Sequence, residues 1–428
     1  MTPEVRDRID QIRQGIVPEG YKKTKSDIVP VDWKESSIGE YICEYTEKTT
    51  IPNQYPVLTS ARTGLMLQTE YYSNRQVTTE NNVGYNILPF GYVTFRSRSD
   101  DGRFRFNENR IIKRGIISYF YPVFSFSEEV CHEYMLYLLN FSIYRRMYPY
   151  AEGTAQQVLS LKKLGQLKYS LPLVAEQKKI AEILSTQDKA IELQERKIEE
   201  LKRFKKGCLE KMFPRKGQKV PETRFPGFTG DWEQRKVSTI ASDTRGGGTP
   251  ATSNETYWSG NIPWIQSSDL SEGKLFGVEP RKYISRDGLN NSATQLVPEN
   301  SIAVVTRVGV GKLAFMPFSY TTSQDFLSLC KLQTEPHFTV YALYQMLQGE
   351  LQAVQGTSIK GMTKDDLLSK SIFAPKDEVE QQQLGSYFRN LDTLITLHQR
   401  KLEEMKKQKK ALMQLLLTGI VKTKGEVR

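Results

Sequence analysis

The 428-residue chain is poor in the side chains on which metal and redox sites depend. It contains only three histidines, and its four cysteines are Cys43, Cys131, Cys208 and Cys330, with no Cys-x-x-Cys pair among them. Cys131 adjoins His132, but neighbouring residues cannot both face one tetrahedral metal ion without further ligands. Because isolated thiols are typical of a reducing compartment, we expect free cysteines, no bound metal and a cytoplasmic location.

Long apolar runs are also absent. No stretch approaches the roughly 18 consecutive apolar residues that a membrane-spanning helix needs. The first fifteen residues, MTPEVRDRIDQIRQG, are charged and helical in pattern, and they lack the apolar core of a signal peptide. We therefore expect no membrane segment and no membrane partner.

Motifs for nucleotide binding and catalysis fail when they are tested residue by residue. GVGK at 309–312 resembles a phosphate-binding loop, but Thr306 stands where that loop needs glycine and Leu313 replaces its Ser or Thr. Without a Pro-Pro dipeptide, the chain cannot contain the NPPY or DPPY loops of amino-methyltransferases. The Glu-x-Lys pairs of nucleases occur at 195–197, within a charged helical stretch, and at 272–274, without a paired Pro-Asp strand. We predict no catalytic residues and no cofactor.

Positive charge is in moderate excess. Lys and Arg number 60 against 49 Asp and Glu, which gives a formal net charge of +11. Such an excess favours a polyanionic partner such as nucleic acid or an anionic surface. Charge alone is equally compatible with a merely basic soluble protein.

One amphipathic stretch occurs twice. Residues 191–206 read IELQERKIEELKRFKK, and residues 395–410, at an offset of 204, read ITLHQRKLEEMKKQKK. Shorter matches keep nearly the same offset: Val-Pro-Glu, Asp-Trp, a Gly-Thr loop and a proline precede each copy. The segments between these landmarks share almost no residues. We therefore predict a duplicated frame that carries two different domains.

Both copies have apolar residues at heptad spacing, which is typical of a coiled coil. Gln187, Gln194 and His398 fall on the same seam, where polar groups can determine the register. Neither helix can bury its apolar stripe alone, so we expect the copies to pair antiparallel as a pseudo-two-fold repeat. The alternative is two independent helices, each packed on its own domain. The expected apolar seam residues are Leu184, Ile191, Ile198, Leu201, Phe388, Leu391, Ile395 and Leu402.

The segments between the helices indicate an α+β fold. Short β-type runs, as in 85–106 and 301–315, are broken by Gly, Pro and Asn, and a helix follows near 131–148 and 338–354. We predict two globular domains joined by two long helices. The expected boundaries are an N-terminal segment at 1–30, a first globular domain at 31–165, a first helical region at 166–218, a second globular domain at 219–368 and a second helical region at 369–428.

Basic, aromatic and small polar residues interleave in both variable domains. Arg and Lys neutralise phosphates, and polar side chains donate to and accept from base edges. A Gly-Gly-Gly run at 246–248 would let the backbone approach a phosphate closely. Ordinary surface charges and core aromatics are the alternative for any single position. The predicted DNA-binding residues are Ser60, Arg62, Arg75, Arg96, Arg98, Arg103, Arg105, Gln156, Arg245, Gly247, Gly248, Thr249, Ser267, Ser268, Arg307, Tyr320, Ser323, Gln324 and Lys360.

This organisation resembles the specificity subunit of type I restriction-modification enzymes. GGGTPATSNETYWSGNIPWIQSSDL at 246–270 is similar to the opening of a target recognition domain of that family, and TRVGVGK, TTSQDFLSL and GTSIKGMTKDDL are similar to its later landmarks. The Glu-Gln start of each long helix matches the family's conserved regions. PVLTSARTG and TEYYSNR relate the first domain to another target-recognition class.

The resemblance implies a non-catalytic subunit that binds double-stranded DNA. Each variable domain would read one half of a split, asymmetric site, and the helices would set the spacer between the halves. The helices would also dock two modification (methyltransferase) subunits, and restriction (translocase-nuclease) subunits would join for cleavage. S-adenosylmethionine, ATP and magnesium would belong to those partners.

Two other classes of function remain compatible with the residues alone. A coiled-coil scaffold or regulator with protein-binding lobes would need only the helices. A nuclease or methyltransferase with disguised motifs would rest on the Glu-x-Lys pairs. A scaffold would lack the salt-dependent DNA affinity of a DNA-binding subunit. An enzyme would cut or methylate DNA as the purified chain alone.

Overall fold

The computed structural model describes residues 2–25, 27–61, 63–72, 81–147, 157–215, 217–353 and 361–423. The chain forms two compact units, of which the first is Met1–Leu193 with Glu403–Arg428 and the second is Gln194–Leu402. Each unit therefore combines one variable domain with a part of both long helices. Within the described ranges, no helix is long and apolar enough to cross a bilayer.

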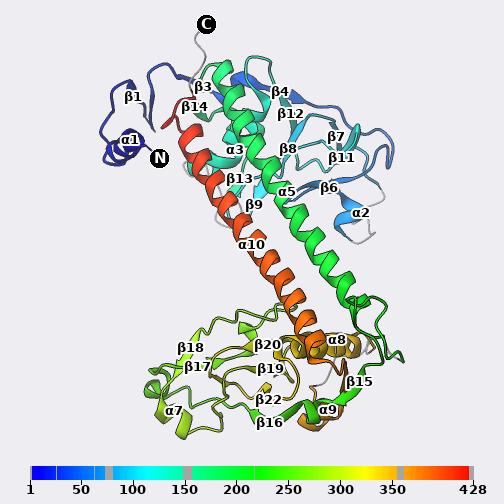
Figure 1. Cartoon of the computed structure of the whole chain (residues 1–428). Coiled ribbons are helices and arrows are strands. Elements are labelled where there is room, and N and C mark those ends of the chain that lie inside the picture. The colour runs from blue at the N-terminus through cyan, green and yellow to red at the C-terminus, as the bar shows by residue number, and fades with distance from the viewer. Residues whose placement is uncertain are drawn as a thin grey trace. The chain divides into compact units, whose positions relative to one another are not determined.

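The first unit contains a segment of each of the two long helices, together with a set of short strands (Figure 1). Its helices are α1 (Pro3–Arg13), η1 (Ile38–Tyr41), α2 (Gln68–Tyr71), α3 (His132–Met147), α4 (Leu161–Gly165), the first half of α5 (Val174–Met212) and the last part of α10 (Glu378–Leu417). Its strands are β1 (Tyr21–Lys23), β2 (Ile28–Pro30), β3 (Lys34–Ser37), β4 (Ile42–Tyr45), β5 (Leu58–Ala61), β6 (Gly64–Leu67), β7 (Asn86–Pro89), β8 (Val93–Phe95), β9 (Arg98–Ser99), β10 (Phe106–Glu108), β11 (Arg114–Ile117), β12 (Val123–Phe126), β13 (Gln157–Val158) and β14 (Lys168–Leu171).

The core of the first unit lies between a four-stranded sheet and helix α3. The sheet has the order β10-β8-β12-β4 and is antiparallel. The Phe95 ring is fully buried in it, with its centroid 4.7 Å from that of Phe106 and 6.3 Å from that of Phe124. Tyr134 of α3 and Leu184 of α5 belong to the same cluster. Helix α3 thus joins the sheet to the long helix.

The second unit has its own sheet and its own helix in the place of α3. Its helices are α6 (Val237–Ile240), η3 (Glu255–Trp258), η4 (Ser267–Asp269), α7 (Arg286–Asn290), α8 (Pro336–Ala353), α9 (Lys364–Ser369), the second half of α5 and the first part of α10. Its strands are β15 (Glu233–Lys236), β16 (Ala241–Gly246), β17 (Ile262–Ile265), β18 (Lys282–Ile284), β19 (Ser301–Val305), β20 (Leu313–Met316), β21 (Thr321–Thr322), β22 (Phe326–Leu332) and β23 (Ser371–Ala374).

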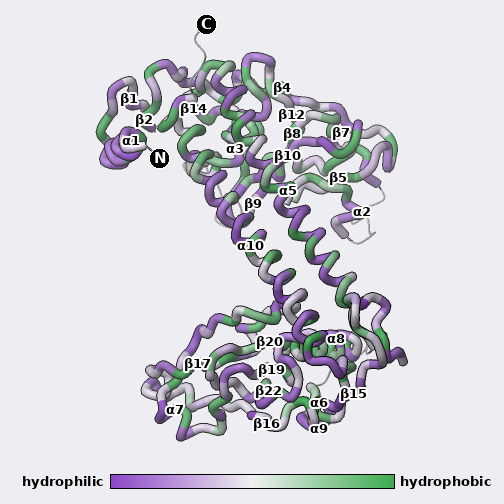
Figure 2. The backbone as a smooth tube through the Cα atoms, in the orientation of Figure 1, coloured by the Kyte–Doolittle hydropathy of each residue, from purple (hydrophilic) through white to green (hydrophobic). Residues whose placement is uncertain are grey.

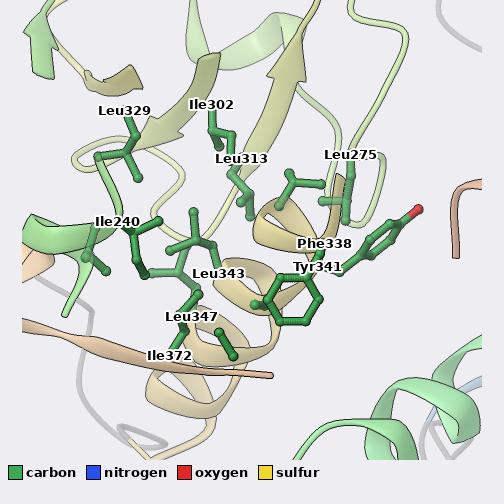
Figure 3. Packing of buried hydrophobic residues seen from close by; sticks show 14 of the residues in the cluster. Ile240, Leu275, Ile302, Leu313, Leu329, Phe338, Tyr341, Leu343, Leu347 and Ile372 are labelled. Carbon is green, nitrogen blue, oxygen red and sulfur yellow. The ribbon is translucent and has the colours of Figure 1, made fainter. Parts of the chain in front are cut away.

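The sequence of strand β19, SIAVV, is almost entirely apolar and does not alternate with polar residues. The strand lies inside the antiparallel sheet β16-β22-β19-β20 and is buried on both faces. Ile302 and Val304 join the cluster formed with α8, while Ala303 and Val305 join a second cluster. Figure 3 shows Leu343 of α8 in the packing against Ile302 and its neighbours. Two small cores therefore share one sheet.

The two long helices pair antiparallel within each unit, as the heptads predicted. In the second unit Gln194 is hydrogen bonded to His398, and Lys205, further along α5, pairs with Asp392, further back along α10. In the first unit Leu184 clusters with Leu416. The predicted seam residues Leu184, Ile191, Ile198, Phe388 and Ile395 are buried, and Leu201, Leu391 and Leu402 are half-buried.

The frame around each domain is duplicated in three dimensions as well as in sequence. In the first unit β3 pairs with β14, the strand that precedes α5. In the second unit β15 pairs with β23, the strand that precedes α10. The Asp-Trp tryptophans that open these strands, Trp33 and Trp232, are 1% and 2% exposed. Helix α1 lies outside this duplication, is almost wholly hydrophilic (Figure 2) and has no buried residue.

The polar pair on the seam leads to a first prediction about stability. The Gln194 amide nitrogen lies 2.8 Å from both the Nδ1 atom and the carbonyl oxygen of His398. Gln194→Leu is expected to lower the free energy of unfolding by about 1–3 kcal/mol, because the imidazole then loses its partner. The double variant Gln194→Leu/His398→Leu should recover that loss, because leucine suits a seam position. Denaturant unfolding of the four proteins measures this as a double-mutant cycle; losses that simply add would contradict it.

Candidate nucleic-acid interface

Four of the predicted contacts in the first unit are exposed arginines around strands β8 to β10. They are Arg96, Arg98, Arg103 and Arg105. Their sequence neighbours Phe95, Phe104 and Phe106 are buried in the core. Because successive side chains of extended backbone point to opposite faces, the buried phenylalanines orient the arginines to solvent. The result is a basic surface on a rigid sheet, which suits contact with phosphates.

A tight turn and an aromatic contact hold this surface in shape. The Asp101 carboxylate accepts hydrogen bonds from the Ser99 hydroxyl at 3.0 Å and from the Arg103 backbone N–H at 3.2 Å. Gly102 between them has φ of 70°, a conformation that glycine adopts without steric cost. The Arg98 guanidinium lies 4.6 Å from the Phe120 ring centroid. Stacking of this kind orients a guanidinium while leaving its N–H donors free to bind.

Ser60 has a partner within the domain. Its hydroxyl oxygen accepts a hydrogen bond of 2.7 Å from the Asn107 side-chain amide, which also donates to the Ala61 carbonyl. This contact ties strand β5 to β10, so the half-buried Ser60 helps to assemble the surface. The predicted contacts Arg62, Arg75, Gln156 and Lys360 lie outside the described residues.

The second unit has a polar edge where strands β17 and β21 end. The two strands are parallel, so their carboxyl ends meet at one side of the sheet. The Ser323 N–H, just after β21, donates to the Ile265 carbonyl at the end of β17. Next to it the exposed side chains of Thr249 and Gln324 are hydrogen bonded at 2.6 Å. Such hydroxyl and amide groups can both donate to and accept from base edges.

Further polar and basic groups continue this edge. The Lys312 ammonium donates to the Ser267 carbonyl at 3.4 Å, and Ser268 beside it is exposed. Arg307 is exposed in the loop between β19 and β20. Arg245, whose side chain is 43% exposed, forms an ion pair of 3.0 Å with Asp243. We call the set Arg245, Thr249, Ser267, Ser268, Arg307, Lys312 and Gln324 the second-domain polar edge.

Tyr320 corrects the sequence prediction. Its side chain is fully buried in the cluster that contains Ile265. Its hydroxyl lies 3.2 Å from that of Ser301 and 3.1 Å from that of Ser328. Burial raises the pKa of the phenol well above its usual value, which keeps it a neutral hydrogen-bonded core group. Tyr320 therefore offers no surface to DNA.

Ser323, Gly247 and Gly248 also have structural roles that the sequence did not reveal. Ser323 is 4% exposed, and its hydroxyl donates to Asp325 at 3.3 Å. A Cβ atom on Gly247 would lie 1.8 Å from the Ser323 carbonyl oxygen, and one on Gly248 would lie 2.5 Å from the Thr294 nitrogen. Close packing of the chain on itself requires glycine at these two positions.

Sequence reasoning missed Lys312, which we add to the set. The residue was tested only as part of a phosphate-binding loop, and its place beside Ser267 depends on a tertiary contact between residues 45 positions apart. The described residues contain no group of three or more His, Cys, Asp or Glu side chains that could hold a metal ion.

Known proteins share both the sequence pattern and the fold. The family model described as "Type I restriction modification DNA specificity domain" matches residues 30–203 and 229–407. The MjaVIII specificity subunit of a type I restriction enzyme of Methanocaldococcus jannaschii is 23% identical over 441 residues, which cover 97% of this chain and 99% of the relative. The putative MjaX specificity subunit of the same organism is 26% identical over 303 residues, 68% of each chain.

Two solved structures have the same fold. The type I restriction-modification S subunit of M. genitalium has a TM-score of 0.56 at 12% identity and covers 96% of this chain and 100% of its own. A chain from a study of complex assembly and conformational transition of a type I R-M system has a TM-score of 0.57 at 17% identity, covering 92% and 99%. With two copies of the family domain spanning most of its length, the chain belongs to the type I restriction-modification DNA specificity family.

Proposed function

We propose that this chain recognises a bipartite, asymmetric double-stranded DNA site, with one half-site read by each variable domain. The observation that carries the proposal is that the frame is duplicated while the two domains it holds are different. The pairing of β3 with β14 and of β15 with β23 is duplicated, whereas the surfaces held by the two frames differ. An arginine row in one unit and the second-domain polar edge in the other would read different sequences.

The long helices would set the gap between the half-sites. A coiled-coil pair is stiff, and B-DNA rises about 3.4 Å per base pair along each strand. A fixed protein length therefore corresponds to a fixed number of unread base pairs. The same helices would dock two modification subunits, and restriction subunits would join that complex for cleavage.

Sequencing the methylated positions in a strain that expresses the chain with its modification subunits tests the proposal. We expect two different short motifs at a constant separation. Binding of the assembled complex to synthetic duplexes should then fall sharply when the gap gains or loses one base pair, since each added pair also rotates one half-site about the DNA axis. A continuous methylated motif, or indifference to the gap, would contradict the proposal. Unchanged assembly without salt-dependent DNA affinity would favour a protein scaffold.

A further inference from the structure

In the first unit three helices meet at one carboxylate. The Tyr137 hydroxyl of α3 donates to Asp188 Oδ2 of α5 at 2.7 Å. The Lys409 ammonium of α10 forms an ion pair with the other oxygen, Oδ1, and lies 5.4 Å from the centroid of the Tyr137 ring. We call Tyr137, Asp188 and Lys409 the first triad. It links the variable domain to both long helices at a single point.

The second unit contains the same arrangement. The Tyr341 hydroxyl of α8 donates to Asp392 Oδ2 of α10 at 2.6 Å. The Lys205 ammonium of α5 lies 2.5 Å from Asp392 Oδ1 and 5.3 Å from the Tyr341 ring centroid. We call Tyr341, Asp392 and Lys205 the second triad. Its carboxylate comes from the helix that supplies the lysine in the first triad, so the two long helices exchange roles.

All three members of the triads are separated by the same 204 residues. The offset is expected for the aspartates and lysines, because they lie in the repeated helices. It is not expected for Tyr137 and Tyr341, which belong to variable domains that otherwise share almost no residues. Between the two domain helices, this tyrosine and the leucine pair Leu139/Leu343 are the residues that are identical at the offset. A polar side chain kept at one register indicates a requirement of the frame.

A second duplicated contact fixes the start of each domain helix. The Gln177 side-chain oxygen accepts from the Cys131 N–H just before α3, at 2.8 Å. The Gln381 side-chain oxygen accepts from the Glu335 N–H just before α8, at 2.9 Å. With the tyrosine contacts six residues later, each domain helix is held at two points, which determines both its position along the long helix and its rotation.

The directed hydrogen bonds of the triads fix the position of each domain helix more strictly than an apolar contact would. Burial, and then the neighbouring aspartate, raises the pKa of both Tyr137 and Tyr341 far above the ordinary value, so each phenol remains a hydrogen-bond donor. A carboxylate that receives two directed donors has one favourable arrangement. A shift of the domain helix by one residue would take the tyrosine donor away from the carboxylate, and losing a hydrogen bond to a charged group in a partly buried place is costly. An apolar contact would tolerate such a shift.

We propose that the two triads are positioning residues that fix how each variable domain is held on the helix pair, and that they thereby determine the half-site separation that the chain accepts. This inference rests on the proposed bipartite recognition. The triads would contact no base. Their effect would be on the gap between the half-sites and not on the sequence of either one.

The test uses the full chain assembled with its modification subunits. Tyr341→Phe, Tyr137→Phe and the double variant remove only the hydroxyl and leave each ring packed. Methylated positions are sequenced genome-wide, and methylation rates are measured on duplexes whose gap is native, one base pair shorter or one base pair longer. We expect both half-site sequences to be unchanged, and the preference for the native gap to fall roughly tenfold in each single variant, the loss of one charge-assisted hydrogen bond.

Matched controls separate positioning from stability. Tyr144→Phe removes the hydroxyl of an exposed tyrosine on α3, and Lys206→Met removes a charge beside Lys205 that pairs with the exposed Glu210. Both should keep the native gap preference. Equal loss of methylation at all three gaps, or an unchanged gap preference in the double variant, would overturn the inference. If the chain without substitutions recognises no two-part site, the proposed function itself fails. That result is distinct from a failure of the triads to determine the gap.

Discussion

Replacing Phe388 by alanine is expected to lower the free energy of unfolding by about 3–5 kcal/mol. The side chain is fully buried near the start of α10. Its ring centroid lies 5.8 Å from that of Phe213, the residue just after α5, and 5.2 Å from that of Tyr341 on α8. The substitution would therefore leave a cavity at the point where both long helices meet the second domain. Denaturant unfolding followed by circular dichroism measures the loss.

Leu397→Ala is the matched control for this change. Leu397 lies on the same helix, but its side chain is 54% exposed, so its truncation should change stability by no more than about 0.5 kcal/mol. Because alanine has the highest helix propensity, similar losses in both variants would mean that burial of Phe388 does not account for its effect.

Arg224→Met is expected to cost a comparable amount, about 3–5 kcal/mol. The Arg224 guanidinium makes two bonds of 2.7 Å to the Glu380 carboxylate, whose side chain is 1% exposed. It also donates to the Gly230 carbonyl at 2.7 Å, which fastens the segment before β15 to the start of α10. Without the arginine, a carboxylate remains buried and uncompensated. Thermal and denaturant unfolding report the loss.

Two further variants separate the cost of an unpaired charge from the loss of an ion pair. Arg215→Met removes a surface arginine bound to Glu222, with side chains 64% and 48% exposed, and should cost no more than about 1 kcal/mol. Arg224→Met/Glu380→Met removes both charges and should recover most of the stability lost in Arg224→Met. If Arg215→Met were as damaging as Arg224→Met, burial of Glu380 would not be the cause.

The sequence predicted the frame well because its signals are local and repeated. Heptad spacing around Ile191 and Ile395 defines an apolar stripe whatever the rest of the chain does. Because neither stripe can be buried alone, we expected the two copies to pair antiparallel. Both features are confirmed by the helix pairing within each unit. The prediction of a non-catalytic specificity subunit is likewise confirmed, by membership of the family and not by missing motifs.

The exposure of the predicted contact residues was predicted less well, because polarity alone does not distinguish an exposed side chain from a buried one. Tyr320 and Ser323 lie three residues apart in a polar stretch, yet both side chains are buried. Gly247 and Gly248 were predicted from the approach of a phosphate alone, and the sequence did not show that close packing also requires glycine there. Lys312 gains its place only through a contact with a distant segment.

By itself the sequence determined that two long helices are encoded in duplicate and carry two unlike α+β domains, because periodicity and repetition depend only on neighbouring residues. Tertiary structure alone decided which side chains face solvent on those domains. It also decided that Tyr137 and Tyr341 meet the aspartates of the frame, 51 residues further along the chain. Contacts of that kind arise from the free energy of whole packed layers, which no local pattern contains.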